Sequence, residues 1–359
     1  MRALISGGGT GGHLFPAIAV AQALRRSDPE SAVLYVGRRG GIEEQVVPAL
    51  DIPFATIAAV KLDREAPLRN WRVPIVLPQA LWDAWRVTRR FRPSVVVGTG
   101  GYVSAPLIMV AAASRVPVVL QEQNYVPGRA TRLLGRLARV IAIAYPQTAG
   151  LLDGARTVLT GTPVREEFQA LRTDFPDRPR HVLVLGGSQG AHRVNLAVAG
   201  AVPALLARPE LTIAHQTGSQ DLAAMEAARR TLPEGVRDRY QPFAFADDLP
   251  RRLRAADLVV SRAGASTLSE TSALGIPMIL VPGPFAGGHQ RLNALPFAQA
   301  NAAILVANDE CDGPRITREI LALVDDPARY RAMIDAMRGQ SRPHAADDVV
   351  QILRQVARG

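Results

Sequence analysis

The sequence predicts an α/β protein with two similar domains, each a doubly wound parallel sheet with helices on both faces. Three observations predict this class. The chain has 359 residues, more than one ordinary hydrophobic core accommodates. Short apolar runs alternate with helical stretches along its whole length. A glycine-rich turn after an opening strand also occurs twice, at Gly7–Gly12 and at Gly186–Gly190.

The first of these turns follows the strand predicted at Arg2–Ser6 and precedes a helix in which Pro16 suits the first turn. Glycine permits positive φ and a close approach of the backbone to a bound group. The N–H groups at a helix start favour an anion, typically phosphate. The turn ends on His13, whose side chain can carry a proton near pH 7. The segment therefore predicts a phosphate cradle beside a candidate base.

The rest of the first half continues the alternation and ends in a polar, proline-broken stretch that runs to Arg180. A strand is expected to end near Thr160. The other predicted strands are Ala32–Val36, Ser94–Val97, Val116–Gln121 and Val140–Ala144, and the predicted helices are Gly41–Leu50, Pro78–Arg90, Ser104–Ala113 and Arg129–Leu137.

The pattern then restarts, with a strand at His181–Leu185, the second glycine turn and a helix at Arg193–Val202. A later unit has a strand at 258–261, a turn at Gly264 and a proline-marked strand at 276–280, and it matches a unit that begins at 95 in the first half. We expect two Rossmann-like domains facing a cleft, with ligands at the carboxyl ends of the strands. The expected domains are 1–162 and 163–341. An amphipathic helix within about 342–359 could pack back on the first.

Composition narrows the function. The net charge is +10, and Lys61 is the single lysine. Such a charge suggests nucleic acid, lipid head groups or phosphorylated substrates as partners, although arginines spread over a solvated surface explain it equally well. No zinc spacing or RNA-binding aromatic motif occurs, so no nucleic acid is expected. No apolar run reaches a membrane span, and the chain begins at once with a strand, so no secretory signal is expected. The lone Cys311 suits a reducing cytosol.

Two nucleotide-binding classes fit poorly. A dinucleotide-dependent dehydrogenase usually has Asp or Glu at the end of its second strand, whereas this strand is followed by Gly37, Arg38 and Arg39. Neither glycine turn carries the Lys-Ser/Thr ending of a P-loop. The turns therefore favour a phosphate-binding cleft of another type.

The turn at Gly264 is the more specific signal. Backbone N–H groups of Ala265, Ser266 and Thr267 could hold a diphosphate at the positive end of a helix dipole. Glu270, one turn later, could accept hydrogen bonds from both ribose hydroxyls. The alternative is that Thr267 and Glu270 form only a capping box. Further on, Gln290 and Asn293 lie three residues apart and could bind sugar hydroxyls or form only a polar helix surface.

These motifs together resemble the MurG family, the bacterial N-acetylglucosaminyltransferases of peptidoglycan synthesis, which have the two-domain GT-B fold. The resemblance runs the whole length of the chain, and the order and spacing of the motifs are more specific than any one of them. The matching segments are Gly7–His13, Gly100–Ser104, Glu122–Asn124, Gly161–Arg165, Gly186–Gly190, Gly264–Glu270 and His289–Asn293.

The resemblance implies transfer of GlcNAc from UDP-GlcNAc to the C4 hydroxyl of MurNAc in undecaprenyl-diphosphate-MurNAc-pentapeptide. It implies catalytic roles for His13 and Glu122, and acceptor binding by Gly9, His13, Gly101 and Tyr102. The implied UDP-GlcNAc site comprises Thr10, Gly11, Gly12, Asn124, Arg165, Ser188, Ala246, Ala265, Ser266, Thr267, Glu270, Gln290 and Asn293. The chain departs from the family at Gln121, where histidine is common, and at Thr162, where asparagine is commoner.

The expected reaction is an inverting single displacement. His13 is the candidate base and Glu122 its rival, while the alternative for His13 is to position the acceptor diphosphate or to cap the loop. No Asp-x-Asp pair stands at a strand end, so we expect metal-independent chemistry without a cofactor. Helix starts, Ser188 and Arg165 would stabilise the leaving diphosphate.

A lipid acceptor implies membrane contact. Trp71, Trp82 and Trp85 lie among arginines, which suits a membrane interface, although the tryptophans could instead be core. Arg129, Arg132, Arg136 and Arg139 are expected on one helical face, where they suit anionic inner-leaflet lipids. The resemblance thus implies a peripheral enzyme on the cytoplasmic face of the cell membrane, with cell-wall and division proteins as partners expected from the family alone.

Three other functions fit parts of this pattern. One is a GT-B transferase with a different lipid or a small-molecule acceptor. The second is a UDP-sugar 2-epimerase, which shares the two-domain fold and needs no acceptor. The third is a nucleotide-binding protein without catalytic activity.

Overall fold

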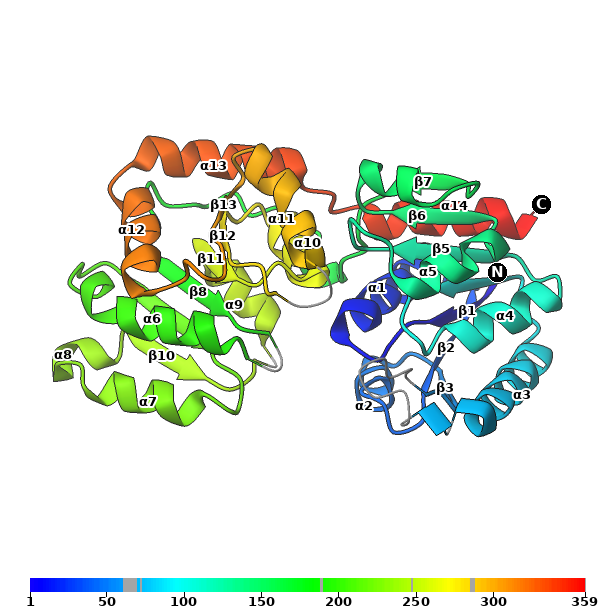
Figure 1. Ribbon diagram of the computed structural model, residues 1–359. Helices are drawn as coiled ribbons and strands as arrows, with labels where there is room; N and C mark the ends of the chain where they lie inside the picture. The colour runs from blue at the N-terminus through cyan, green and yellow to red at the C-terminus, as the bar shows by residue number, and fades with distance from the viewer. Residues whose placement is uncertain (61–69, 72, 188–189, 247, 285–287, 359) are drawn as a thin grey trace. The chain divides into compact units, whose positions relative to one another are not determined.

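The chain folds into two α/β units, each built on one parallel sheet (Figure 1). The computed structural model describes residues 1–60, 70–71, 73–187, 190–246, 248–284 and 288–358. Unit 1 comprises Met1–Glu166 together with His344–Gly359, and unit 2 comprises Glu167–Pro343.

Unit 1 has a seven-stranded sheet in the order β3-β2-β1-β4-β5-β6-β7, with every neighbouring pair parallel. Its strands are β1 (Arg2–Ser6), β2 (Ala32–Arg38), β3 (Phe54–Ile57), β4 (Val95–Gly98), β5 (Val118–Glu122), β6 (Val140–Ile143) and β7 (Thr157–Leu159). Its helices are α1 (Gly11–Ser27), α2 (Glu43–Val46), α3 (Val73–Phe91), α4 (Ala105–Ala113), α5 (Arg129–Leu134) and α14 (Ala345–Arg358), with 3₁₀ turns η1 (Pro48–Leu50), η3 (Gly135–Leu137), η4 (Pro146–Leu151) and η5 (Glu166–Phe168) near the sheet edges and the end of the unit.

Two apolar layers cover the sheet of unit 1. Alternate strand residues such as Ile5 and Val97 face α1 and α14, whereas their neighbours Leu4 and Val96 face α3 and α4. Helix α1 is apolar on nearly all sides because it lies between the sheet and α14, whose Val349 and Leu353 are fully or almost fully buried. The C-terminal helix thus packs on the first helix of the chain.

Unit 2 repeats this design with a six-stranded parallel sheet in the order β10-β9-β8-β11-β12-β13. Its strands are β8 (His181–Leu185), β9 (Thr212–Gln216), β10 (Tyr240–Phe243), β11 (Leu258–Ser261), β12 (Met278–Leu280) and β13 (Ala303–Leu305). Its helices are α6 (His192–Leu205), α7 (Leu222–Arg230), α8 (Glu234–Arg237), α9 (Leu249–Ala255), α10 (Ala265–Ala273), α11 (His289–Gln299), α12 (Gly313–Val324) and α13 (Pro327–Gln340).

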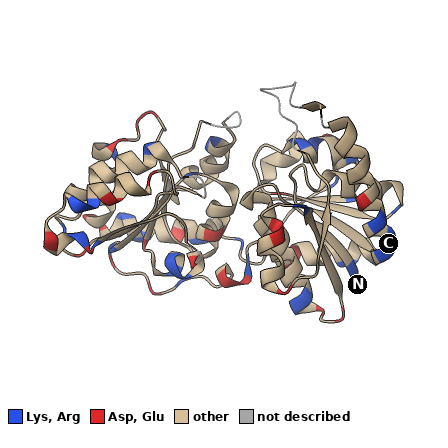
Figure 2. Ribbon diagram, turned by 90° about the horizontal axis from the view of Figure 1, so that it is seen from below, with Lys and Arg blue, Asp and Glu red and all other residues tan. Residues whose placement is uncertain are grey.

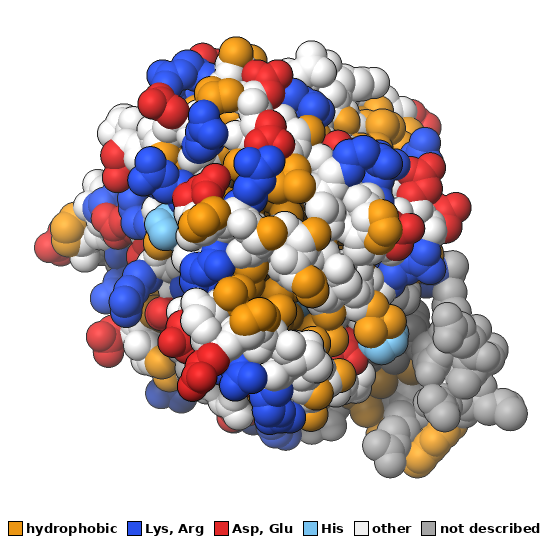
Figure 3. Space-filling view, turned by 90° about the vertical axis from the view of Figure 1, so that its left-hand side faces the viewer, with side chains coloured by type: hydrophobic (Ala, Val, Ile, Leu, Met, Phe, Trp, Pro, Cys, Tyr) orange, Lys and Arg blue, Asp and Glu red, His pale blue; other side chains and the backbone are white. Residues whose placement is uncertain are grey.

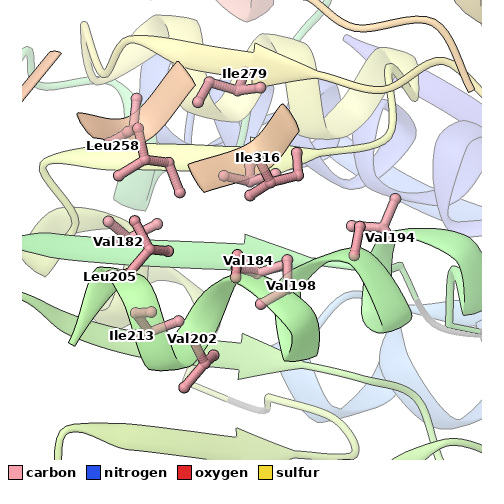
Figure 4. Packing of buried hydrophobic residues seen from close by; sticks show 14 of the residues in the cluster. Val182, Val184, Val194, Val198, Val202, Leu205, Ile213, Leu258, Ile279 and Ile316 are labelled. Atoms are coloured by element: carbon pink, nitrogen blue, oxygen red, sulfur yellow. The ribbon is translucent and has the colours of Figure 1, made fainter. Parts of the chain in front are cut away.

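The core of unit 2 lies between its sheet and the helices α6 and α12. Val182 and Val184 of β8 pack with Val194 and Val198 of α6 in this core (Figure 4). Strand β8 lies between β9 and β11, just as β1 lies between β2 and β4. The turns after β8 and after β1 therefore occupy corresponding positions in the two sheets.

Several predicted elements differ from the observed ones. The predicted helix at Gly41–Leu50 is two short pieces, α2 and η1, because Pro48 lacks the N–H that would continue α2. The predicted helix at Arg129–Leu137 is α5 followed by the tighter turn η3. Helix α1 begins at Gly11, so Pro16 lies in its second turn rather than its first.

Basic and acidic residues alternate along the chain of both units (Figure 2). The face of unit 2 in Figure 3 carries basic and acidic residues side by side. Surface pairs in unit 2 include Arg208 with Asp325 and Arg315 with Glu310. Several arginines of this unit therefore lie in ion pairs on a solvated surface.

Candidate active site

The glycine turn of unit 1 places His13 in the first turn of α1. Thr10 is the N-cap residue and makes no side-chain capping bond, so Gly11, Gly12 and His13 are the first three helical residues. Nδ1 of His13 lies 3.0 Å from the carbonyl oxygen of Thr99, at the end of β4. Burial lowers the pKa of His13, and the charge of Glu122 and the Thr99 carbonyl oppose this shift. The imidazole is therefore neutral at neutral pH.

The turn is held from behind by buried polar side chains. The carboxylate of Glu43, fully buried at the start of α2, accepts a hydrogen bond of 2.5 Å from the backbone N–H of Gly9. The Tyr35 hydroxyl donates to the carbonyl oxygen of Gly7. Gly9, predicted to bind the acceptor, thus already uses its N–H within the fold. In the described part of this helix start, the N–H groups of Gly11 and Gly12 remain for an anion.

Two further glycines, Gly100 and Gly101, lie directly against the ring of His13. A Cβ on Gly100 would lie 2.8 Å from Nδ1 of His13, and a Cβ on Gly101 would lie 2.2 Å from the carbonyl oxygen of Gly8. Both glycines have positive φ. The ring of Tyr102 covers Gly9, where an added Cβ would lie 2.7 Å from it. The predicted acceptor residues Gly101, Tyr102 and His13 are therefore close together in unit 1.

Glu122 lies at the end of β5 with both carboxylate oxygens engaged. Oε1 accepts from the backbone N–H and the side-chain amide of Asn124, at 3.0 and 3.1 Å. Oε2 accepts from the N–H of Gly128 at 2.8 Å and from the Thr131 hydroxyl at 2.6 Å. Four donors fix this buried carboxylate, so it anchors the segment between β5 and α5. The same bonds commit the side chain of Asn124 to Glu122.

Arg165 belongs to unit 1 and lies beside the start of α1. Its guanidinium carbon is 4.5 Å from the centre of the Phe15 ring. This contact places a positive charge near the helix start that carries Gly11, Gly12 and His13.

In unit 2, α10 begins directly after Gly264, which is the N-cap residue without a side-chain cap. Ala265, Ser266 and Thr267 are therefore the first three helical residues. The hydroxyl oxygen of Ser266 is buried and has no hydrogen-bond partner among the described residues. Because the helix starts at Ala265, Thr267 is not an N-cap, and the capping-box alternative for Thr267 and Glu270 is wrong.

Other predicted donor residues of unit 2 lie on neighbouring elements. Glu270 is 4% exposed in the second turn of α10. Gln290, in the first turn of α11, accepts a 2.8 Å hydrogen bond from the N–H of Gly283 through Oε1, and Asn293 is buried one turn later. Ala246 follows β10 and is almost buried. Ser188 lies outside the described residues.

A buried network supports the glycine turn after β8. His215 bonds the Tyr240 hydroxyl through Nδ1 at 2.9 Å and Oδ1 of Asn195 through Nε2 at 3.0 Å. The Asn195 amide in turn donates to the carbonyl oxygen of Thr217 at 2.8 Å. A Cβ on Gly190 would lie only 2.5 Å from that oxygen. Burial lowers the pKa of His215 to about 3.

The tryptophans of unit 1 are exposed, so the core alternative for them is wrong. Trp71 is 64% exposed, Trp82 57% and Trp85 38%. Trp82 and Trp85 stack on each other along α3, with ring centres 4.8 Å apart. The face of α3 that packs on α4 carries the small side chains of Ala80 and Ala84 instead.

Four exposed arginines lie on α5 or shortly after it. Helix α5 contacts α4, which in turn packs on α3. The arginines do not share one helical face as predicted, because α5 ends at Leu134 and Arg139 lies beyond η3. The four are Arg129, Arg132, Arg136 and Arg139. Within the described residues, no helix is both long and apolar enough to cross a bilayer.

Residues 3–143 match the glycosyltransferase family 28 N-terminal domain, and residues 181–349 match the glycosyltransferase family 28 C-terminal domain. Two similar proteins are the UDP-N-acetylglucosamine--N-acetylmuramyl-(pentapeptide) pyrophosphoryl-undecaprenol N-acetylglucosamine transferases of Moorella thermoacetica and Desulforudis audaxviator. The first is 38% identical over 98% of both chains, and the second is 37% identical over 99% of both. The chain belongs to the MurG family of glycosyltransferases.

Solved structures agree with this membership. The MurG of Acinetobacter baumannii superposes with a TM-score of 0.76 at 28% identity and covers 99% of each chain. A UDP-GlcNAc 2-epimerase from Neisseria meningitidis, bound to UDP-GlcNAc, superposes with a TM-score of 0.72 at 13% identity over 99% of this chain and all of its own. The second likeness shows the fold alone. The predicted GT-B fold is thereby confirmed.

Three polar residues at the site had no predicted role. Glu43 and Thr99 contact the first glycine turn only through tertiary packing, so no local pattern indicated them. Gln123 stood inside a quoted motif, and its amide lies within hydrogen-bond distance of Nδ1 of His13. The period of two along β5 could have indicated it, because Gln123 follows Val119 and Gln121 on the face toward α1.

Proposed function

We propose that the protein transfers N-acetylglucosamine from UDP-GlcNAc to the C4 hydroxyl of the MurNAc sugar in undecaprenyl-diphosphate-MurNAc-pentapeptide, with inversion at C1. In this proposal unit 2 binds the donor, and unit 1 binds the acceptor and supplies the base. The observation that carries it is the start of α10 in a chain of this family. There, a helix N-terminus without a side-chain cap coincides with the buried hydroxyl of Ser266, which has no hydrogen-bond partner among the described residues.

The donor diphosphate fits this helix start for a physical reason. The first N–H groups of α10 point out of the helix and favour negative charge, and a hydroxyl that is buried without a partner is costly until a ligand bonds it. An anion beside Ala265, Ser266 and Thr267 satisfies both. Glu270 would accept from the ribose hydroxyls, Ala246 would line the base pocket, and Gln290 and Asn293 would contact the sugar. Ser188, Arg165, Thr10, Gly11, Gly12 and Asn124 complete the proposed donor set.

His13 is our choice for the base. Its pKa is lowered by burial, so the imidazole is neutral and able to accept a proton at neutral pH. Glu122 is a poor rival because four hydrogen bonds already stabilise its carboxylate in place. The C4 hydroxyl would pass its proton to His13 as its oxygen bonds C1, and the bond from C1 to the diphosphate oxygen would break to release UDP. Tyr102 and Gly101 would position the acceptor.

The exposed tryptophans support peripheral binding to an anionic bilayer. Trp82 and Trp85 form a stacked apolar surface on α3, and the guanidinium of Arg89 lies over the Trp85 ring. On α5, Leu133 is 79% exposed and follows the exposed Arg132. We propose that this surface binds the anionic leaflet that contains the lipid acceptor, on the cytoplasmic face of the membrane.

This surface is tested with vesicles that contain anionic phosphatidylglycerol, at low salt. The protein should sediment with them, and the double variant Trp82→Ser, Trp85→Ser should bind at least tenfold more weakly. Leu196→Ser removes an equally exposed apolar side chain from unit 2 and is the matched control. Equal binding of all three proteins would overturn the assignment of the surface.

The reaction is tested with radiolabelled UDP-GlcNAc and a short-chain analogue of the lipid acceptor. We expect acceptor-dependent release of UDP and a disaccharide-lipid product, and the same rate in EDTA because helix starts and Arg165 provide the positive field. Formation of UDP-ManNAc without acceptor would show an epimerase instead. Binding of UDP-GlcNAc with no product of either kind would show a nucleotide-binding protein without this activity.

A further inference from the structure

The surroundings of His13 restrict which of its ring nitrogens carries the proton. Nδ1 lies 3.0 Å from the Thr99 carbonyl oxygen, and the Gln123 amide approaches the same nitrogen. A backbone carbonyl can only accept a hydrogen bond, so Nδ1 of His13 must be protonated to use this contact. A protonated Nδ1 cannot accept a hydrogen bond from an amide nitrogen.

The Gln123 amide must therefore present its oxygen to His13. The nitrogen and the oxygen of an amide occupy nearly the same space, and only the hydrogen-bond partners distinguish them. With the nitrogen beside Nδ1, the Gln123 oxygen is buried and has no partner among the described residues. The opposite orientation gives that oxygen a donor, the N–H of Nδ1.

The rotated amide needs an acceptor for its NH₂ group, and the amide oxygen of nearby Gln121 is unused among the described residues. Gln121 is fully buried, and neither of its amide atoms has a hydrogen-bond partner within the described part of the chain. Residues 121 and 123 lie two apart along extended chain and so face the same side of the sheet. A row of hydrogen bonds can then run from His13 through Gln123 to Gln121.

We propose that Gln123 is a positioning residue that accepts a hydrogen bond from Nδ1–H of His13 through its amide oxygen, together with Thr99, and so leaves the lone pair of Nε2 for the acceptor hydroxyl. In the described residues no hydrogen bond reaches Nε2. The inference deepens the proposed function, since the use of Nε2 as a base rests on it, but the protonation of the ring can be measured without turnover.

Whether the pKa of His13 falls or rises when the hydrogen bond from Gln123 is removed distinguishes the two amide orientations. An oxygen beside Nδ1–H stabilises the charged imidazolium and raises the pKa of His13, whereas an amide N–H donated to Nδ1 stabilises the neutral ring and lowers it. Replacing Gln123 by methionine removes either bond with little change in shape. The charged and titratable groups around the ring and its loop are Glu122 on β5, Tyr102 after β4, Glu43 on α2, Tyr35 on β2 and Arg165, which lies over the Phe15 ring. All of them are kept in this variant.

The experiment is an NMR titration of the histidine ring protons and nitrogens in the full chain, with His13→Gln used for assignment. At pH 8 the native protein should show His13 protonated at Nδ1. Gln123→Met should lower the pKa of His13 by about 0.5–1 pH unit, the size of one hydrogen bond. Gln123→Glu should raise it. Gln22→Met, which removes a partly buried amide from α1, the helix that carries His13, should leave it unchanged.

A native ring protonated at Nε2, or a rise of the pKa in Gln123→Met, would overturn the proposal whatever the enzyme catalyses. In the transferase assay, Gln123→Met should lower kcat about tenfold with little change in KM for UDP-GlcNAc. Gln123→Glu should recover most of kcat and move the acid limb of the pH profile upward. Loss of all turnover in the native protein, with the expected titration, would count against the proposed function and not against the role of Gln123.

Discussion

The glycine turns after β1 and after β8 occupy corresponding positions in the two units, yet each is held by different chemistry. In unit 1 the carboxyl group of Glu43 holds the turn directly through the N–H of Gly9, and the histidine lies in the helix that follows. In unit 2 the amide of Asn195 supports the turn, the carboxylate of Asp221 accepts from that amide, and both ring nitrogens of His215 are bonded. Similar glycine patterns therefore predict similar backbones but not similar chemistry.

The two histidines show this difference most clearly. Oδ1 of Asn195 can only accept, so His215 carries its proton on Nε2, whereas the Thr99 carbonyl requires the proton of His13 on Nδ1. Burial lowers the pKa of both rings. In His215 no ring nitrogen remains for a substrate, which makes it a structural residue, while the hydrogen bonds of His13 among the described residues involve Nδ1 and leave Nε2 for the proposed role as a base.

The largest effect is expected for His13→Ala. Removal of a general base should lower kcat by about 10²–10⁴-fold. Binding of UDP, measured by calorimetry, should stay within about twofold because the proposed contacts of the diphosphate and uridine at α10 lie in unit 2 and do not involve His13. His344→Ala, which replaces an exposed histidine of unit 1, is the control. A raised KM for the acceptor with kcat retained would instead give His13 a binding role and weaken the contrast with His215.

Glycine substitutions test whether the two turns share a backbone requirement. Gly101→Ala, whose Cβ would meet the carbonyl oxygen of Gly8 in the first turn, and Gly190→Ala, within the second turn, each add a Cβ within 2.5 Å of a carbonyl oxygen at positive φ. Strain of about 1–2 kcal/mol from φ and about 1–3 kcal/mol from overpacking should destabilise each unit. Gly187 also has positive φ, but nothing lies within 4 Å of an added Cβ, so Gly187→Ala should cost only the strain of the positive φ and no overpacking. Urea unfolding measures all three, and an equal cost for Gly187 and Gly190 would contradict the packing argument.

Acid should destabilise unit 2 through His215. Its pKa is about 3 in the folded chain and about 6.5 when unfolded, so below pH 6.5 the unfolded state binds the proton and the folded state does not. The free energy of unfolding should fall by up to about 1.4 kcal/mol for each pH unit between those values. Urea unfolding at pH 7.5, 6 and 5 should show a shallower loss in His215→Gln. An unchanged slope would show that His215 is protonated in the folded state.

The smallest effect is expected for Ser266→Ala. Loss of one hydrogen bond to the diphosphate should weaken UDP binding by about 1 kcal/mol, or roughly fivefold. The stability of the protein without ligand should not fall, because the removed hydroxyl has no partner within the described residues. Weaker folding with unaltered UDP affinity would place Ser266 in the support of the turn, as with Asn195, and not in the donor site.

The sequence predicted the fold well where strands are buried on both faces. Runs such as Val95–Val97 and Val182–Leu185 are continuous and apolar, which is the pattern of central parallel strands. β3 was missed because Phe54–Ile57 is a short edge strand whose first three residues are only partly buried. The first helix and its glycine turn were visible because their signals are local.

The site was predicted less completely. Turn glycines, His13 and the α10 start follow from short patterns, whereas Glu43 meets Gly9 across 34 positions and Gln123 meets His13 across 110. Such contacts depend on strand order, which no local pattern contains. Glu122 was predicted as a possible base from its motif, and only its four hydrogen-bond donors indicate an anchoring role.

Because α14 belongs to unit 1 but is synthesised last, the two units are completed at different times during synthesis. Unit 2 is one continuous segment, so all of its core residues have been made by residue 343. The core of unit 1 lacks Val349, Val350 and Leu353 until the last turns of the chain leave the ribosome. His13 lies on α1, the helix that α14 covers, so in the proposed function the nascent protein completes the unit that binds the donor before the unit that binds the acceptor is fully packed.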